Sequence, residues 1–203
     1  MGEIYSRKAN NPMVTFMEPA RKTHGLSFDD WLEQENDHAI RHELIHGELW
    51  AMVGGTDLHN LIALGLRDAL KTRLGSPSCR IFVADVKLRV GEDGFYPDVM
   101  VSCSTTDQNR LYKTEPTLLA EVLSDTSVQR DRVTKYAAYR RLSSLQAYLL
   151  LSQEAPRVET HCRDGEHWRR SEYTVDEHIE LPGLTSAVPV REIYAEVLEF
   201  MGF

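Results

Sequence analysis

Two apolar segments with an amphipathic helix between them constrain the fold of this chain most strongly. Residues 117–124 (TLLAEVLS) and 145–152 (LQAYLLLS) are apolar at nearly every position, as expected for strands that are covered on both faces of a sheet. The intervening residues 127–144 have the periodicity of a helix with one apolar face. A strand, a helix and a second strand in this order predict a β-α-β unit and therefore an α/β fold.

The remaining elements extend this unit into one domain with a mixed β-sheet flanked by helices. We expect a helix that begins at Ser27, a hairpin that turns at His46-Gly47, and a helix capped by Asp57 and ended by Gly75. Further expectations are strands over 79–90 and 96–102, a polar hairpin over 157–174 that turns at Asp164-Gly165, and a final helix over 188–201. The domain spans residues 26–203, and residues 1–25 are expected to be a loose N-terminal leader.

Composition and charge limit which cellular compartment and which binding partners we expect for this chain. The three cysteines are odd in number and widely spaced, which argues against a disulfide framework and for a reducing, cytoplasmic location. No apolar run approaches the roughly 20 residues that a membrane span needs, so we expect no membrane partner. The net charge of −8 counts against broad coating by nucleic acid but not against a local basic groove.

Two successive predicted strands each carry one carboxylate in an apolar setting. Asp98 lies within YPDVMVS and Glu121 within TLLAEVLS. Burying a carboxylate is costly unless it is paired, and two carboxylates that converge repel each other. A hard divalent cation such as Mg²⁺ resolves both problems, because it takes oxygen ligands and often only one or two carboxylates plus water.

The predicted helix that follows adds a cation to this pair. Helical spacing places Asp131 and Lys135 on one stripe with apolar residues, so Lys135 extends toward the sheet. There its amine can orient a water molecule or stabilise charge on a phosphoryl oxygen. Asp131 and Lys135 also fit a plain surface ion pair.

Each carboxylate has a structural interpretation as well. Asp98 also fits a strand-end residue that is hydrogen-bonded to a loop. Glu121 also fits an ion pair with Arg130 or Arg132. The order of the three groups on consecutive elements favours a functional site.

Four segments together resemble the PD-(D/E)XK nuclease superfamily and, within it, the Uma-type family of restriction-endonuclease-like proteins. The segments are YPDVMV, LLAEVLS, RDRVTKYAAYRRL and LQAYLLL. The resemblance implies a restriction-endonuclease-like core in which Asp98 and Glu121 bind Mg²⁺. The superfamily has a lysine two residues after the glutamate, where this chain has Leu123, so the resemblance implies that Lys135 takes its place.

The resemblance also points to residues around this centre. The family has an acidic residue near the N-terminus, for which Glu48 is our candidate and Glu43 the reserve, since both lie on one face of the expected hairpin. His59 is expected to face the cleft and contact substrate. Arg130 and Arg132 belong to a basic strip that is a candidate track for the nucleic-acid backbone.

These observations predict a Mg²⁺-dependent endonuclease, with Mn²⁺ as a substitute, that hydrolyses phosphodiester bonds in nucleic acid, most simply DNA. Asp98 and Glu121 are the expected metal ligands, and Lys135 and Glu48 complete the catalytic set. Because closed two-fold symmetry is common, we expect a homodimer. The alternatives are a non-catalytic interaction module on a nuclease fold and a metal-dependent phosphodiesterase for small substrates.

Overall fold

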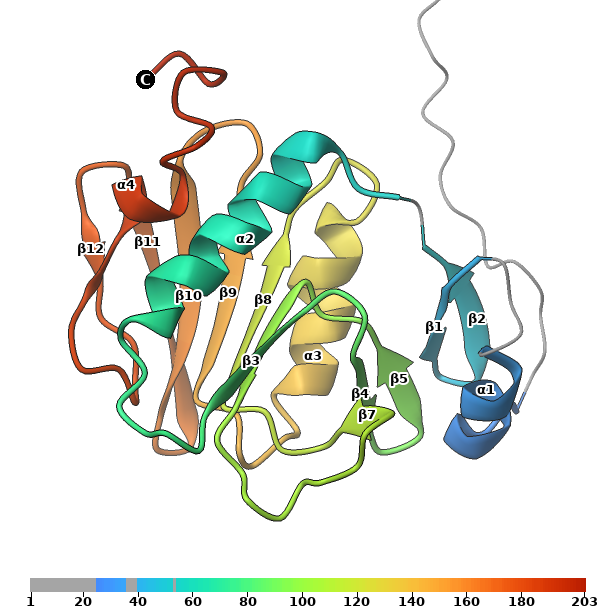
Figure 1. Ribbon diagram of the computed structural model, residues 1–203. Coiled ribbons are helices and arrows are strands. Elements are labelled where there is room, and N and C mark those ends of the chain that lie inside the picture. Colours follow the sequence, from blue (N-terminus) through green and yellow to red (C-terminus); the bar gives the residue numbers. More distant parts are fainter. Residues whose placement is uncertain (1–24, 36–39, 53) are drawn as a thin grey trace, which may run out of the picture.

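A six-stranded mixed sheet forms the centre of the computed structural model, which describes residues 25–35, 40–52 and 54–203 (Figure 1). The strand order is β11-β10-β9-β8-β6-β3. Its strands are β3 (Arg80–Val83), β6 (Val99–Ser102), β8 (Leu118–Val122), β9 (Ala147–Leu151), β10 (Arg157–Asp164) and β11 (His167–Thr174). The expected leader lies, apart from Gly25, outside the described residues.

The β-α-β unit predicted from the sequence is present. Strands β8 and β9 pair in parallel, with Ala120 opposite Leu149, and the other pairs of this sheet are antiparallel. The helix between them begins as a π-helical stretch, η1 (Arg130–Lys135), and continues as α3 (Tyr136–Tyr139). Both strands are buried at every position, which explains their continuous apolar sequence.

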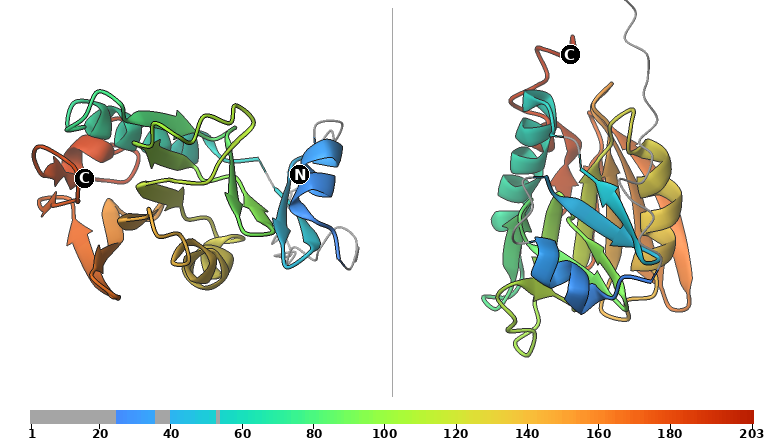
Figure 2. Two further views of the ribbon diagram at one scale, coloured as in Figure 1. Left: turned by 90° about the horizontal axis from the view of Figure 1, so that it is seen from below. Right: turned by 90° about the vertical axis from the view of Figure 1, so that its right-hand side faces the viewer.

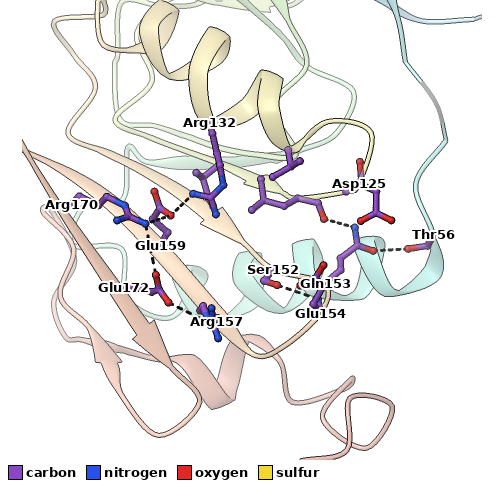
Figure 3. Close-up of a pocket in the computed structure, with 14 residues that line it drawn as sticks. Thr56, Asp125, Arg132, Ser152, Gln153, Glu154, Arg157, Glu159, Arg170 and Glu172 are labelled. Atoms are coloured by element: carbon purple, nitrogen blue, oxygen red, sulfur yellow. Dashed lines mark hydrogen bonds and ion pairs between the residues drawn. The ribbon is translucent and has the colours of Figure 1, made fainter. Parts of the chain in front are cut away.

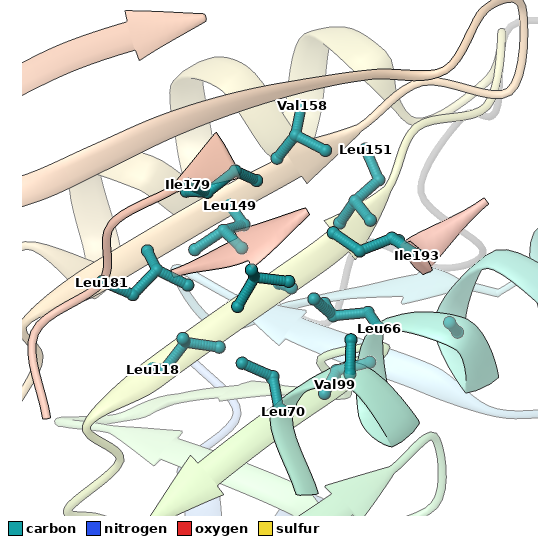
Figure 4. Packing of buried hydrophobic residues seen from close by; sticks show 14 of the residues in the cluster. Leu66, Leu70, Val99, Leu118, Leu149, Leu151, Val158, Ile179, Leu181 and Ile193 are labelled. Carbon is teal, nitrogen blue, oxygen red and sulfur yellow. The ribbon is translucent and has the colours of Figure 1, made fainter. Parts of the chain in front are cut away.

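Helices cover both faces of this sheet, as the left view of Figure 2 shows. On one face, α2 (Asp57–Lys71) packs Leu66 and Leu70 against Val99 and Leu149 of the strands (Figure 4). On the other face, Tyr139 of α3 belongs to a second apolar cluster. Alternate residues of each strand therefore point into the two different apolar clusters. A carboxylate that points toward α3 takes a position where an apolar side chain would otherwise pack.

A second sheet, which the sequence did not predict as separate, holds the N-terminal hairpin. Its order is β2-β1-β5-β4-β7. The strands are β1 (His42–Ile45), β2 (Glu48–Ala51), β4 (Lys87–Val90), β5 (Asp93–Phe95) and β7 (Tyr112–Lys113). The expected single strand over 79–90 is wrong: the backbone breaks at Ala84, which has a φ of 61°, so its halves become β3 and β4 of different sheets.

Several local expectations can be compared with the structure. Ser27 caps α1 (Phe28–Glu35) through the Asp30 amide, and His46-Gly47 forms the hairpin turn with φ values of 53° and 78°. The cap of α2 is Thr56, not Asp57, because the Thr56 hydroxyl accepts the His59 N–H. The helix ends at Lys71, before Gly75.

The C-terminal part of the chain is less helical than expected. A short pair of strands, β12 (His178–Ile179) and β13 (Val188–Pro189), precedes a single helical turn, α4 (Val190–Ile193). Turns continue from there to residue 202. None of the helices in the described ranges combines the length and apolar composition needed to cross a bilayer.

The cysteine prediction is wrong for one pair. Cys79 and Cys103 form a disulfide, with their Cα atoms 3.9 Å apart. They face each other because Arg80 pairs with Ser102 in the antiparallel β3-β6 ladder, and the register extends by one residue. Sequence spacing could not show this, since the pairing depends on the strand break at Ala84. Cys162 is a free, buried thiol.

Candidate active site

Asp98 and Glu121 come together where β6 begins and β8 ends. Val99 pairs with Ala120, so extending this antiparallel register places Asp98 opposite Glu121. The Val122 N–H donates a hydrogen bond of 2.7 Å to Asp98 Oδ2, which fixes the carboxylate at the strand end. Both residues line one pocket, as predicted from their placement in successive strands.

Lys135 occupies the centre of the acidic cluster. Its Nζ atom lies 2.9 Å from Glu43 Oε1, 3.1 Å from Glu121 Oε1 and 3.3 Å from Asp131 Oδ1. All four side chains are buried. The lysine therefore points toward the sheet and not into solvent, and it forms a buried network with three carboxylates.

Burial and charge set the protonation of this network. Burial raises the pKa of Glu121 well above its usual range, and the nearby charges of Asp98 and Asp131 add to the effect while Lys135 opposes it. For Lys135, burial lowers the pKa, but the surrounding carboxylates outweigh it and raise that pKa well above normal. The Tyr139 hydroxyl donates a hydrogen bond of 2.8 Å to Glu121.

Two further basic residues predicted from the sequence line the same pocket. His59 Nε2 lies 3.1 Å from Asp98 Oδ2. Burial lowers the pKa of His59, but the hydrogen bond and charge of Asp98 outweigh this and raise it overall. Arg130 lies 3.6 Å from Glu43 Oε2 and stacks over the Trp50 ring at 5.0 Å.

Two predicted site residues are placed elsewhere. Glu48 pairs with Ile45 beside the hairpin turn and does not line the pocket, so the expectation that it completes the acidic cluster is corrected in favour of Glu43. Glu43 accepts the Tyr96 N–H as well as the Lys135 ammonium. Arg132 lines a neighbouring pocket and contacts Glu159 there.

The pocket has a volume of about 730 Å³ and its donor set suits a hard cation. Asp131 Oδ1 is buried and, among the described residues, has the ion pair with Lys135 but no hydrogen bond. Five carboxylates line the pocket together with the cationic Lys135 and Arg130; they are those of Glu43, Asp98, Glu121, Asp125 and Asp131. Within the described ranges no three metal-binding side chains already surround a common point.

The chain has the restriction-endonuclease-like nuclease fold. It matches a solved structure from Anabaena variabilis, described as a "putative nuclease belonging to DUF820", with a TM-score of 0.64 and 14% sequence identity over 84% of this chain and 98% of that chain. That similarity confirms the fold class predicted from the sequence.

The particular family follows from sequence. The model of the Uma2 family, described as "Putative restriction endonuclease", matches residues 27–191, and the chain belongs to this family. Uncharacterized protein sll1609 of Synechocystis sp. is 34% identical over 146 residues, which cover 70% of this chain and 82% of that protein. Uncharacterized protein slr1290 of the same organism is 30% identical over 173 residues, covering 83% and 91%.

Proposed function

We propose that this protein is a metal-dependent nuclease that hydrolyses phosphodiester bonds in nucleic acid, most simply in DNA. One observation carries the proposal: Asp98, Glu121 and Lys135 come from three different elements and line one pocket. A structural ion pair needs only two of these groups. The surplus of carboxylates favours a site that also accommodates a cation.

Asp98 and Glu121 would hold the cation, which we expect to be Mg²⁺ with Mn²⁺ as a substitute. When bound, it lowers the pKa of a water ligand and neutralises charge on the phosphate. Glu43 and Asp131 hold the Lys135 ammonium in place. This positioning leaves Lys135 able to donate a hydrogen bond to the attacking water or to a phosphoryl oxygen.

The two other basic groups extend this function to substrate binding. The Arg130 guanidinium and the His59 imidazole line the same pocket as the carboxylates. A guanidinium matches the geometry of a phosphate, and a protonated His59 adds a second donor. The DNA preference, the homodimer and the cytoplasmic location expected from the sequence stay predictions.

Incubation of the purified protein with supercoiled plasmid tests the proposal. We expect nicked and then linear DNA with Mg²⁺ or Mn²⁺ and no change in EDTA. Asp98→Asn removes the charge of a metal ligand but keeps an oxygen for the Val122 N–H, so it should fold and lose cleavage. Asp176→Asn, at an exposed aspartate paired with Arg191, is the matched control and should cleave normally.

Two outcomes would contradict the proposal. Binding without cleavage of plasmid, single strands or RNA would indicate the non-catalytic module. Preferential hydrolysis of a small chromogenic phosphodiester, without competition by an oligonucleotide, would indicate a phosphodiesterase for small substrates.

A further inference from the structure

A second pocket adjoins the candidate active site. It has a volume of about 540 Å³ and shares Thr56, Ser124, Asp125 and Gln153 with the first pocket (Figure 3). The Gln153 side chain accepts the Thr56 hydroxyl at 2.8 Å and donates to the Leu123 carbonyl at 2.7 Å. This bridge ties the N-terminus of α2 to the end of β8 at the boundary between the two pockets.

One buried carboxylate organises two arginines in this second pocket. Glu159 of β10 accepts hydrogen bonds from Arg132 of η1 and, at 2.8 Å, from Arg170 of β11 (Figure 3). Its other oxygen lies 2.8 Å from His161 Nε2. The bonds from Arg170 and Arg132 lower the pKa of Glu159 to about 2, so it stays ionised at any working pH.

The charges of this group do not balance. Glu172 also lies 3.8 Å from Arg170 and 3.3 Å from Arg157, so two carboxylates face three guanidiniums and this group keeps one positive charge. The Arg132 and Arg170 side chains are 40% and 59% exposed, whereas that of Glu159 is 6% exposed. The carboxylate therefore fixes the arginines from below while their remaining N–H groups face solvent, where they can bind an anion.

The pocket also holds carboxylates other than Glu159. Glu172 lies between Arg157 and Arg170, and its contact with Arg157 is the shorter of the two. Asp125 and Glu154 are exposed to solvent at the rim. Apolar side chains of Leu123, Val128 and Leu150 also line the pocket, which leaves a surface suited to a sugar or base.

We propose that this second pocket binds the nucleotide next to the scissile bond, with its backbone phosphate held by Arg132 and Arg170. The proposal rests on the proposed function, because it takes the first pocket as the place where the bond is cut. A nucleic-acid strand that leaves the first pocket past Gln153 enters the second directly. In a chain with a net charge of −8, the Arg132 and Arg170 guanidiniums supply local positive charge inside a rim that also carries Asp125 and Glu154.

Neighbouring arginines on β11 offer a matched pair of variants. Arg170 lies opposite His161 and faces the pocket, while Arg169 lies opposite Cys162 and points to the other side of the hairpin. Arg170→Gln and Arg169→Gln make the same chemical change one residue apart. Both positions are exposed, so both variants should fold.

Fluorescence anisotropy with a labelled mixed-sequence oligonucleotide in EDTA measures binding without cleavage. Arg170→Gln should weaken binding about tenfold, since a charge-assisted contact is lost. The slope of log affinity against log salt should fall by about 0.7 for a single strand or 0.9 for a duplex. Arg132→Gln should act similarly, and Arg169→Gln should change affinity less than about twofold on the same scale.

The results separate this inference from the nuclease proposal. Equal losses in the Arg170 and Arg169 variants, no loss in the Arg170 and Arg132 variants, or no binding by the wild type would overturn the second pocket, even if plasmid is cleaved. A selective loss in the Arg170 and Arg132 variants would support nucleic-acid binding in the second pocket, and if the wild type then failed to cleave DNA, the nuclease proposal alone would be overturned.

Discussion

Glu121 is the residue at which burial and charge conflict most directly. Its side chain is 3% exposed, and it shares the pocket with Asp98 and the buried Asp131. Among the described residues, the Lys135 ammonium and the Tyr139 hydroxyl are the close stabilising partners of its Oε1 atom. The folded state therefore favours the protonated form of Glu121 until a further cation is present.

Glu121→Gln should stabilise the protein against heat in EDTA at pH 8. A raised folded-state pKa contributes stability that is complete below the usual glutamate pKa and is lost as pH rises toward the folded value. The neutral glutamine avoids that loss and still accepts the Tyr139 hydroxyl. Its advantage in melting temperature should therefore shrink as the pH falls toward 5.

The comparison needs melting curves of both proteins across this pH range. Glu43 and Asp131 remain as partners of Lys135 in the variant, so the ammonium is not left unpaired. A variant that melts lower than the wild type at every pH would show instead that Glu121 belongs to a core ion pair, whose disruption typically costs about 3–5 kcal/mol.

Glu43 and Glu48 allow a test of the acidic cluster within one hairpin. Glu43→Gln should reduce the rate of DNA cleavage about 10- to 100-fold, because Lys135 loses one of the carboxylates that position it. Glu48→Gln makes the same change outside the pocket and should leave the rate within about twofold. Similar rates in the two variants would remove Glu43 from the site.

The central site residues were predictable, whereas their supporting residues were not. Asp98 and Glu121 stood out because carboxylates are rare in apolar strands, and Lys135 because it lies on an apolar helical stripe. Glu43 and Glu48 share one hairpin face, and the sequence does not show which end of that face meets η1. Glu159 was missed because the buried residues of β10 include the polar Thr160 and His161. A strand with so many polar residues has the sequence of a solvated hairpin.

The π-helical stretch η1 is an element that the sequence predicted only in part. The sequence predicted a helix that carries Asp131 and Lys135 on one side, and both are buried there. The wider turn of the π-helix depends on tertiary packing, and such stretches frequently occur at functional sites. Likewise, the break between β3 and β4 has no glycine signal: the Ala84 N–H donates to the Asp98 carbonyl, a contact distant in sequence.

Close packing between α2 and the C-terminal segment gives a prediction for these elements. A Cβ atom added at Gly65 would lie 2.1 Å from the Ile193 carbonyl oxygen. Gly65→Ala should therefore lower the melting temperature by roughly 2–6 °C, because the overpacking exceeds the gain in helix propensity.

Gly54→Ala is the control for this variant, since a Cβ atom there would meet nothing within 4 Å. It should melt within about 2 °C of the wild type. A higher melting temperature for Gly65→Ala would contradict the prediction. It would mean that α4 can move away from α2 without a loss of stability.

At the scale of the whole molecule, the Cys79–Cys103 disulfide joins the ends of β3 and β6 that lie away from Asp98. Reduction should lower the melting temperature by roughly 6–12 °C, since closing a loop of this size contributes about 3 kcal/mol. DNA cleavage should not change, because Asp98 precedes β6 and Cys103 follows it.

Differential scanning calorimetry with and without dithiothreitol measures this effect. The Cys79→Ser/Cys103→Ser double variant should melt like the reduced wild type and should not respond to dithiothreitol. An equal melting temperature for the oxidised and reduced wild type would show that the bridge adds nothing to the fold.

The position of Lys135 among three carboxylates has a consequence for how a divalent cation would bind at the proposed site. The ammonium is a counter-ion that the chain carries with it, so part of the charge repulsion is offset without a metal ion. Folding therefore does not wait for metal, unlike that of small zinc domains, which are unfolded without it. A divalent ion at the proposed site would share Glu121 with this tethered ammonium, so its affinity would depend on the competition between the two cations.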